Sequence, residues 1–198
     1  MSNVISLKKG DVINLSKSPV ININKGLSQV TVGLGWDPVK QKKGLFGGFT
    51  TPDIDCDAFI SCPEVNSKDN LIYYGCLKNN DGSIYHTGDN LTGDGDGDDE
   101  ALIVDLNRVK CNRLVVGVNI YNAHSRKQHF GMLENAFVRI VDNNTHTEMC
   151  RYTLDNQYAG KTAIIFGELV RTDGVWNFRA VGEAFDSENI SATLKAYL

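Results

Sequence analysis

Long apolar runs are missing from this sequence. No stretch approaches 18 consecutive apolar residues, so no membrane-spanning helix is predicted. The beginning, MSNVISLKKGDVINL, lacks the apolar segment that a signal peptide requires. We therefore expect a cytoplasmic protein with no transmembrane segment.

Cysteine pairs of the metal-binding type are also missing. The five cysteines are an odd number and form no C-x-x-C motif, which argues against zinc held by thiolates. In a cytoplasmic protein we expect all five to be reduced. Most lie in apolar runs, where burial raises a thiol pKa and lowers its reactivity. They are Cys56, Cys62, Cys76, Cys111 and Cys150.

Excess positive charge is absent. The formal net charge is −4, and this argues against a nucleic-acid partner, which usually requires a basic face. Proline is scarce at 4 residues and glycine plentiful at 19, a composition typical of tight turns rather than of a proline-rich linker. With 198 residues and 41% hydrophobic content, we expect one domain over residues 1–198.

Long amphipathic helices are absent, and the dominant hydrophobic period is two. SQVTVGLGW, ALIVDL, RLVVGVNIY, AFVRIVD, TAIIFGELVR and VWNFRAVGEAF all have the composition or alternation of strands. Asp173-Gly174 separates the last two and predicts a two-residue hairpin turn. We predict an antiparallel β-sandwich, mainly β, with Trp36, Trp176 and Phe178 in its core.

Few segments are left for helices and loops. HSRKQHFGMLENAF could contain a short helix, and SENISATLKAYL could form another, capped by Ser187. KQKKGLFGGFTTP, residues 40–52, is expected to be a mobile basic loop. The scattered histidines, His86, His124, His129 and His146, are expected at the surface.

One segment, HTGDNLTGDGDGDDE, concentrates negative charge. Six acids occupy residues 89–100 with no Lys or Arg among them, directly before the predicted strand ALIVDL. Two like charges about 5 Å apart cost roughly 3 kcal/mol at a surface-like dielectric constant. Within a folded domain, such a cluster requires something that neutralises it.

A second acidic segment lies upstream, in PDIDCDAFISC. Read as a strand, it places Ile54, Cys56, Ala58 and Ile60 on one face and Asp53, Asp55 and Asp57 on the other. Neighbouring carboxylates on that face would be about 6.6 Å apart. This spacing suits two adjacent ions, or one ion and a solvated outlying acid.

Oxygen-rich, irregular and highly charged sites favour a hard cation. The alternation of aspartate with Gly95 and Gly97 lets the backbone curl while carboxylates converge, and Ca²⁺ takes six to eight oxygens. An EF-hand is rejected, because Asp99 replaces its glycine and Asp105 its final glutamate. The alternatives are a solvated acidic turn, or a metal-dependent hydrolase or phosphoryl-transfer enzyme with two ions. No nucleophile–base pair or phosphate loop supports the enzyme.

The candidate metal ligands come from both acidic segments. In so dense a cluster some acids, Asp99 and Glu100 above all, could instead face solvent or support the ligands. The full set is Asp53, Asp55, Asp57, Asp89, Asn90, Asp94, Asp96, Asp98, Asp99 and Glu100.

These segments resemble the bacterial TerD family of tellurium-resistance and general stress proteins. HTGDNLTGDGDGDDE carries the family's signature. The other matching segments follow the family's order over nearly the whole chain: VISLKKGDVINL, VTVGLGWDP, DIDCDAF, FGMLENAFVRIVD and AIIFGELVRTDGVWNFRAVGEAF. The GLFGG loop and DGSIYHTGDN are most similar to the TerZ branch.

The resemblance implies a β-sandwich that holds two Ca²⁺ ions between acidic loops. It implies a role in resistance to tellurite, phage and colicins without catalysis, and a TerC-type partner at the inner face of the membrane. The family's D-x-D pair falls on Asp53 and Asp55, its GDN on residues 88–90 and its GDGDDE on residues 95–100. Asp57 departs from the family pattern, which often has a small residue there.

Overall fold

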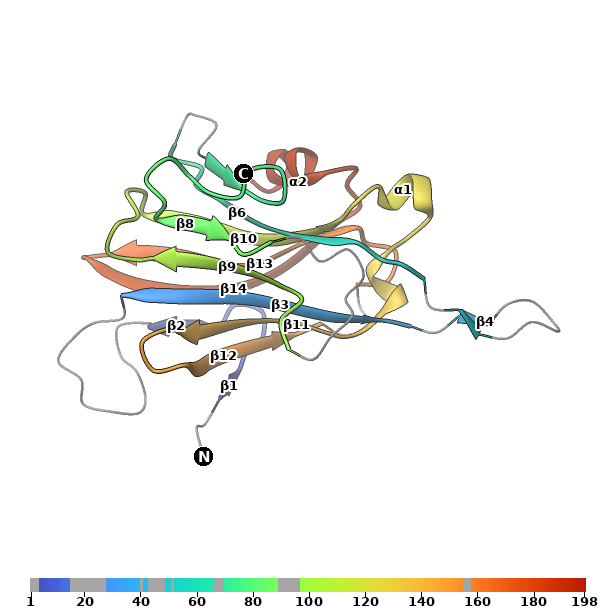
Figure 1. Cartoon of the computed structure of the whole chain (residues 1–198), viewed down its shortest axis with the longest axis horizontal. Helices are drawn as coiled ribbons and strands as arrows, with labels where there is room; N and C mark the ends of the chain where they lie inside the picture. Colours follow the sequence, from blue (N-terminus) through green and yellow to red (C-terminus); the bar gives the residue numbers. More distant parts are fainter. Residues whose placement is uncertain are drawn as a thin grey trace.

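The computed structural model describes residues 4–14, 28–39, 41–42, 49–50, 52–65, 70–88, 97–154 and 158–198. These residues form two stacked β-sheets, and the short helices lie outside them (Figure 1). The strands are β1 (Ile5–Ser6), β2 (Val12–Asn14), β3 (Gln29–Pro38), β4 (Gln41–Lys42), β5 (Phe49–Thr50), β6 (Cys56–Ser61), β7 (Leu71–Ile72), β8 (Ile84–His86), β9 (Glu100–Asp105), β10 (Arg113–Ile120), β11 (Leu133–Asp142), β12 (Thr147–Thr153), β13 (Ala163–Thr172) and β14 (Val175–Phe185).

Each large sheet has six described strands. The first has the order β1-β12-β11-β3-β9-β8 and the second the order β2-β14-β13-β10-β6-β7. The pairings within them are antiparallel except for that of β1 with β12, which is parallel. The predicted sandwich is therefore confirmed, with one parallel pair at a sheet edge. β4 and β5 form a separate hairpin within the predicted loop 40–52, and in Figure 1 it lies beyond the end of the sandwich.

The alternation in the sequence marks the inner faces of the sheets. On β3, Val30, Val32, Leu34 and Trp36 are all buried in the main core. Trp176 and Phe178 of β14 belong to the same core, as predicted. Side chains of period two from both sheets thus fill the space between them.

The second sheet is also covered on its outer face. Helix α2 (Ile190–Tyr197) lies there, and its Ile190 packs in a second apolar cluster with Phe59, Val115 and Ile165. This cover explains why β10 reads as a nearly continuous apolar run, RLVVGVNI, because a strand buried on both faces needs no polar side.

The carboxylate of Glu168 holds α2 against the sheet. The residue is buried, and it accepts hydrogen bonds from Arg113 Nε at 2.9 Å, from the Tyr197 hydroxyl at 2.7 Å and from Arg179. Burial alone would raise the pKa of Glu168, but hydrogen bonds from Tyr197, Arg113 and Arg179 outweigh it and lower the pKa. A charged carboxylate on β13 is thus stabilised by partners from β10, β14 and α2.

The predicted Asp173-Gly174 turn is confirmed between β13 and β14. Asp173 has φ 52° and Gly174 φ 78°, so both central residues are left-handed. A two-residue hairpin of type I′ requires this conformation at both positions, and it matches the twist of the strands.

The helices differ in detail from the prediction. Asn189 caps α2, since its side chain accepts a hydrogen bond from the Ala192 amide at 2.9 Å. The predicted cap at Ser187 is wrong, because Ser187 is buried and its amide donates to the Thr162 hydroxyl at 2.7 Å. HSRKQHFGMLENAF begins within helix α1 (Ala123–Arg126), continues through a 3₁₀ turn (Phe130–Met132) and ends in β11.

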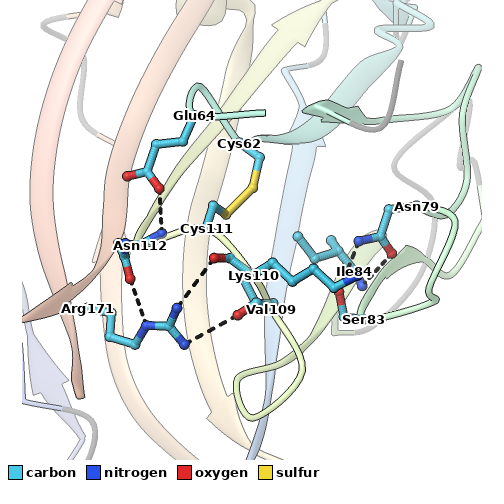
Figure 2. The surroundings of a disulfide bond; sticks show 10 residues. All are labelled: Cys62, Glu64, Asn79, Ser83, Ile84, Val109, Lys110, Cys111, Asn112 and Arg171. Atoms are coloured by element: carbon cyan, nitrogen blue, oxygen red, sulfur yellow. Dashed lines mark hydrogen bonds between the residues drawn. A yellow bond between two sulfur atoms is a disulfide. The ribbon is translucent and has the colours of Figure 1, made fainter. Parts of the chain in front are cut away.

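A disulfide joins Cys62 and Cys111, whose Cα atoms are 6.4 Å apart (Figure 2). The expectation that all cysteines are reduced is wrong for this pair, because the fold brings together residues separated by 49 positions. Glu64 accepts from the Asn112 amide at 2.8 Å, and Arg171 Nε donates to Asn112 Oδ1 at 2.9 Å. The bridge therefore lies in a fixed corner that connects the end of β6 with the start of β10.

The other three cysteines form no disulfide, as predicted. Cys56, Cys76 and Cys150 are free, and Cys56 and Cys150 are buried. Burial raises the pKa of Cys150 to about 12. Within the described residues, no helix is long and apolar enough to cross a membrane.

Candidate functional site

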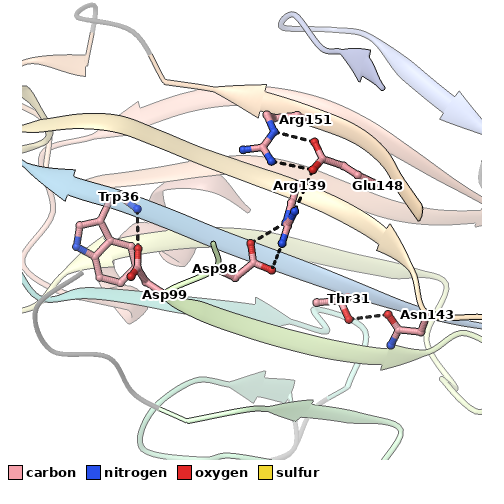
Figure 3. Close-up of polar contacts among 8 residues, drawn as sticks. All are labelled: Thr31, Trp36, Asp98, Asp99, Arg139, Asn143, Glu148 and Arg151. Atoms are coloured by element: carbon pink, nitrogen blue, oxygen red, sulfur yellow. Dashed lines mark hydrogen bonds and ion pairs between the residues drawn. The ribbon is translucent and has the colours of Figure 1, made fainter. Parts of the chain in front are cut away.

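Asp98, at the end of the acidic segment, is neutralised by an arginine. Arg139 of β11 donates from Nε to Asp98 Oδ1 at 2.8 Å and from Nη2 to Oδ2 at 3.1 Å (Figure 3). Arg139 also binds Glu148, which Arg151 binds in turn. Two arginines and two carboxylates thus form a charge-balanced row on the outer face of the first sheet.

Two glycines of β3 make room for the acidic segment. A Cβ on Gly33 would collide with the carboxyl group of Asp98, and a Cβ on Gly35 would lie 2.6 Å from the Gly97 carbonyl oxygen. The glycines of VTVGLGW therefore leave a surface on which residues 97 and 98 lie directly against the backbone.

Asp99 and Glu100 bind backbone amides of both sheets. Asp99 Oδ2 accepts from the Trp36 amide at 2.8 Å (Figure 3). Glu100 Oε2 accepts from the Ala58 amide at 2.6 Å. Glu100 is buried, although it is an acid. Its bond to β6 connects the two acidic segments that the sequence places 42 residues apart.

His86 lies beside Glu100. Its Nε2 is 3.3 Å from Glu100 Oε2, while its Nδ1 accepts from the Gly88 amide at 3.1 Å. The prediction that all four histidines are at the surface is wrong for His86, which is buried where β8 meets the acidic segment.

The upstream acids occupy different environments. Asp53 and Asp55 precede β6, and Asp57 lies within it. The Asp53 side chain is exposed and pairs with Arg126 Nη2 at 3.4 Å, whereas Asp55 and Asp57 are buried. Ile54, Cys56, Ala58 and Ile60 face the main core, as predicted.

Four of the predicted ligands raise the pKa of one thiol. The pKa of Cys56 is raised well above its ordinary value, first by burial and then by the negative charges of Glu100, Asp57, Asp55 and Asp99. All four carboxylates therefore lie close enough to Cys56 to repel a thiolate. The two acidic segments converge at this end of the sandwich.

Four further candidates, Asp89, Asn90, Asp94 and Asp96, lie outside the described residues. The residues that flank them are held together, because the Thr87 amide donates to the Ala101 carbonyl at 2.9 Å. Within the described residues, no three His, Cys, Asp or Glu side chains form a group that could hold a metal ion. The metal-ligand role of all ten candidates stays a prediction.

No sequence pattern pointed directly to the basic and backbone partners of these acids. Arg139 was visible only as a single charge in the apolar run FVRIV, and the amides of Trp36 and Ala58 carry no sequence signal. These partners reach the acids because β3 pairs with β9 and β11, and because β6 of the second sheet lies next to β9 of the first.

The TerD domain model matches residues 3–197. The chain belongs to the TerD family. It is 47% identical over 181 residues to the stress response protein SCP2 of Bacillus subtilis, covering 87% of this chain and 91% of that protein. It is 42% identical over 166 residues to the tellurium resistance protein TerZ of Serratia marcescens, covering 81% and 82%.

TerD itself, from Serratia marcescens, is 40% identical over 163 residues, covering 80% of this chain and 82% of that protein. A TerZ and a TerD protein are thus similar to nearly the same extent, and the assignment to the TerZ branch stays a prediction. A crystal structure of a TerD homologue from Streptomyces coelicolor matches with a TM-score of 0.63 and 25% identity, covering 84% of this chain and 95% of that one. The solved structure and the sequence relatives therefore lead to the same assignment, the TerD family of resistance and stress-response proteins.

Proposed function

We propose that this TerD-family protein is a non-enzymatic calcium-binding stress-response protein, in which Ca²⁺ stabilises the fold or a partner-binding surface. The observation that carries the proposal is the convergence of the two acidic segments, which the Glu100–Ala58 hydrogen bond joins. The negative charges of Glu100, Asp57, Asp55 and Asp99 all help to raise the pKa of Cys56, so acids of both segments lie in its neighbourhood.

The donor set fits Ca²⁺. The converging groups are carboxylates, and Ca²⁺ prefers six to eight oxygen ligands in flexible geometry. Asp98 already has a compensating arginine, which reduces its need for a metal. Asp89, Asn90, Asp94 and Asp96 would complete the set, and two ions would offset four of the negative charges.

The cellular setting is part of the same proposal. Relatives of this chain are named as tellurium resistance and stress response proteins. We place the protein in the cytoplasm, with a peripheral position at the inner membrane through a TerC-like partner. Such a role requires a metal-stabilised surface rather than a reaction centre.

A calcium titration of metal-stripped protein tests the proposal. Isothermal calorimetry with native mass spectrometry should give saturable binding of two ions. Unfolding midpoints should rise with Ca²⁺ and fall with chelator, and at 100 times the dissociation constant each site contributes about 2.7 kcal/mol. An unchanged melt and no bound ion would contradict the proposal.

Matched variants locate the site. Asp55→Asn and Asp96→Asn should weaken binding at least tenfold, because each removes a charged ligand. Asp186→Asn is the control, since Asp186 is an exposed acid outside both acidic segments and pairs with His124. Phosphatase or nuclease activity with Mg²⁺ or Mn²⁺ that Asp96→Asn abolishes would instead establish an enzyme.

A further inference from the structure

A polar cavity of about 300 Å³ lies on the outer face of the second sheet, beside the beginning of α2. The residues that line it come from β6, the turn after β7, the end of β10 and the start of α2. Volumes of this order accommodate small ligands. Asp57 is the one described candidate calcium ligand in its lining.

Three tyrosines form an aromatic wall of the cavity. The Tyr73 and Tyr74 rings meet edge to face with centroids 4.9 Å apart, and the Tyr74 and Tyr121 rings do so at 5.7 Å. Tyr74 is 38% exposed and Tyr121 is 40% exposed, unusually high for large aromatic side chains. A wall of this kind presents electron-rich ring surfaces to whatever enters the cavity.

Two buried polar residues lie at the sheet side of the cavity. Asp57 of β6 is paired with Asn119 of β10 across the strands, and both are nine-tenths or more buried. Asn119 Nδ2 donates to the Ile120 carbonyl at 2.9 Å, but its Oδ1 accepts no hydrogen bond from any of the described residues. A buried carbonyl oxygen without a donor costs free energy, so it marks a place where a ligand donor fits.

The charge of the cavity selects the ligand class. Its described lining contains the carboxylates of Asp57 and Glu188 and no Lys, Arg or His. Asp57 and Tyr74 both line the cavity, and the negative charge of Asp57 helps to raise the pKa of Tyr74, after burial. Acids and aromatic faces together are typical of sites for organic cations.

We propose that this cavity binds a small primary ammonium ion, such as a diamine or polyamine. The ammonium group would lie against the tyrosine faces and donate one N–H to Asn119 Oδ1, on the side of the cavity that also carries acidic residues. A quaternary ammonium fits less well, because it has no N–H to offer Asn119.

An anion is the main competing ligand, since the first turn of α2 borders the cavity. A helix end is equivalent to about half a positive charge, whereas the lining contains two carboxyl groups and no basic side chain. Asn189, the cap residue, already accepts a hydrogen bond from within the helix. The balance therefore favours a cation.

The experiment is a titration of the full-length protein with putrescine, followed by calorimetry and by amide chemical shifts. Chelator is present in one series and saturating Ca²⁺ in another. We expect saturable shifts confined to residues 71–74, 119–122 and 188–191 in both series. The neutral isostere 1,4-butanediol should cause none, and tetramethylammonium should bind at least tenfold more weakly.

Variants on the exposed wall avoid damage to the core. Tyr74→Leu should weaken putrescine binding about tenfold, and Tyr74→Phe should restore it, because a phenyl ring keeps the aromatic face. Tyr85→Leu is the matched control, since Tyr85 is also 38% exposed but lies on β8, outside the cavity lining. Asn119→Leu, which has no acceptor, should reduce the preference for putrescine over tetramethylammonium.

Several outcomes would overturn the proposal. One is the absence of saturable binding by every ammonium ion, and another is equal binding of 1,4-butanediol. Shifts of the same amides by Ca²⁺ alone, with putrescine silent, would make the cavity a metal site. Calcium binding elsewhere with no amine binding would refute this inference and leave the proposed function intact.

Discussion

The carboxylate of Asp98 lies directly over the backbone of Gly33, in the space that a side chain would occupy. From that position it pairs with Arg139. One glycine in β3 therefore allows an acidic segment to close against the sheet, and a strand without that glycine would push the segment away. The relationship has consequences that can be measured.

Gly33→Ala should lower the free energy of unfolding by about 1–3 kcal/mol, the usual cost of forcing extra volume into a packed site. The new Cβ must displace the Asp98 carboxyl group and disturb its bidentate pair with Arg139. Urea unfolding followed by fluorescence measures the change. The same substitution in an Asp98→Ala background should cost less, because the clash is gone; equal costs in both backgrounds would contradict the steric explanation.

Glu168→Gln should lower the free energy of unfolding at neutral pH by about 1.5–3 kcal/mol, the range of hydrogen bonds to charged groups. Arg113 and Arg179 keep contact with solvent, which moderates the loss. Chemical unfolding of the variant at pH 7 measures it. Glu148→Gln serves as a comparison on the other sheet, since Glu148 also binds two arginines.

The same carboxylate should make stability depend on pH. Because the pKa of Glu168 is lower in the folded state, its contribution is complete above the unfolded value of about 4.3 and is lost as pH falls through the folded value. The difference in stability between wild type and Glu168→Gln should therefore shrink below about pH 4. A difference that stays constant from pH 7 to 3 would refute the assigned hydrogen bonds.

Reduction of the Cys62–Cys111 bridge should destabilise the protein by about 4 kcal/mol, since the closed loop spans 49 positions. For a chain of this size the melting temperature should fall by roughly 8–16 °C. Differential scanning calorimetry with and without reductant measures the shift. A Cys62→Ala/Cys111→Ala variant should melt at the low temperature under both conditions, and a wild type indifferent to reductant would count against the bridge.

Alkylation should distinguish the three free thiols. In the folded, unreduced protein at pH 8, Cys76 should react first, because it is only half-buried. Cys56 and Cys150 should react at least a hundredfold more slowly, since their raised pKa values and burial keep them as protected thiols. Mass spectrometry of iodoacetamide-treated protein gives the order, and unfolding in urea should make all three equally reactive.

Much of the fold could be predicted because period-two patterns and turn residues act locally. Alternation placed Val30 to Trp36 in the core, and Asp173-Gly174 predicted its hairpin, because few other residues adopt the required left-handed conformation. The N-cap of α2 was misplaced by two residues, since Ser187 and Asn189 are equally good caps in isolation. Only the contact with Thr162 decided between them.

For the acidic segments, too, some features follow from the sequence and others only from the tertiary structure. By itself the sequence determined that residues 53–57 and 89–100 carry an unusual density of carboxylates and that a family of known fold matches them. Tertiary structure alone decided that Glu100 reaches β6, that Arg139 neutralises Asp98 and that Cys62 meets Cys111. These contacts join residues 41 to 49 positions apart. No local pattern encodes such pairs, because strand order and sheet packing bring them together.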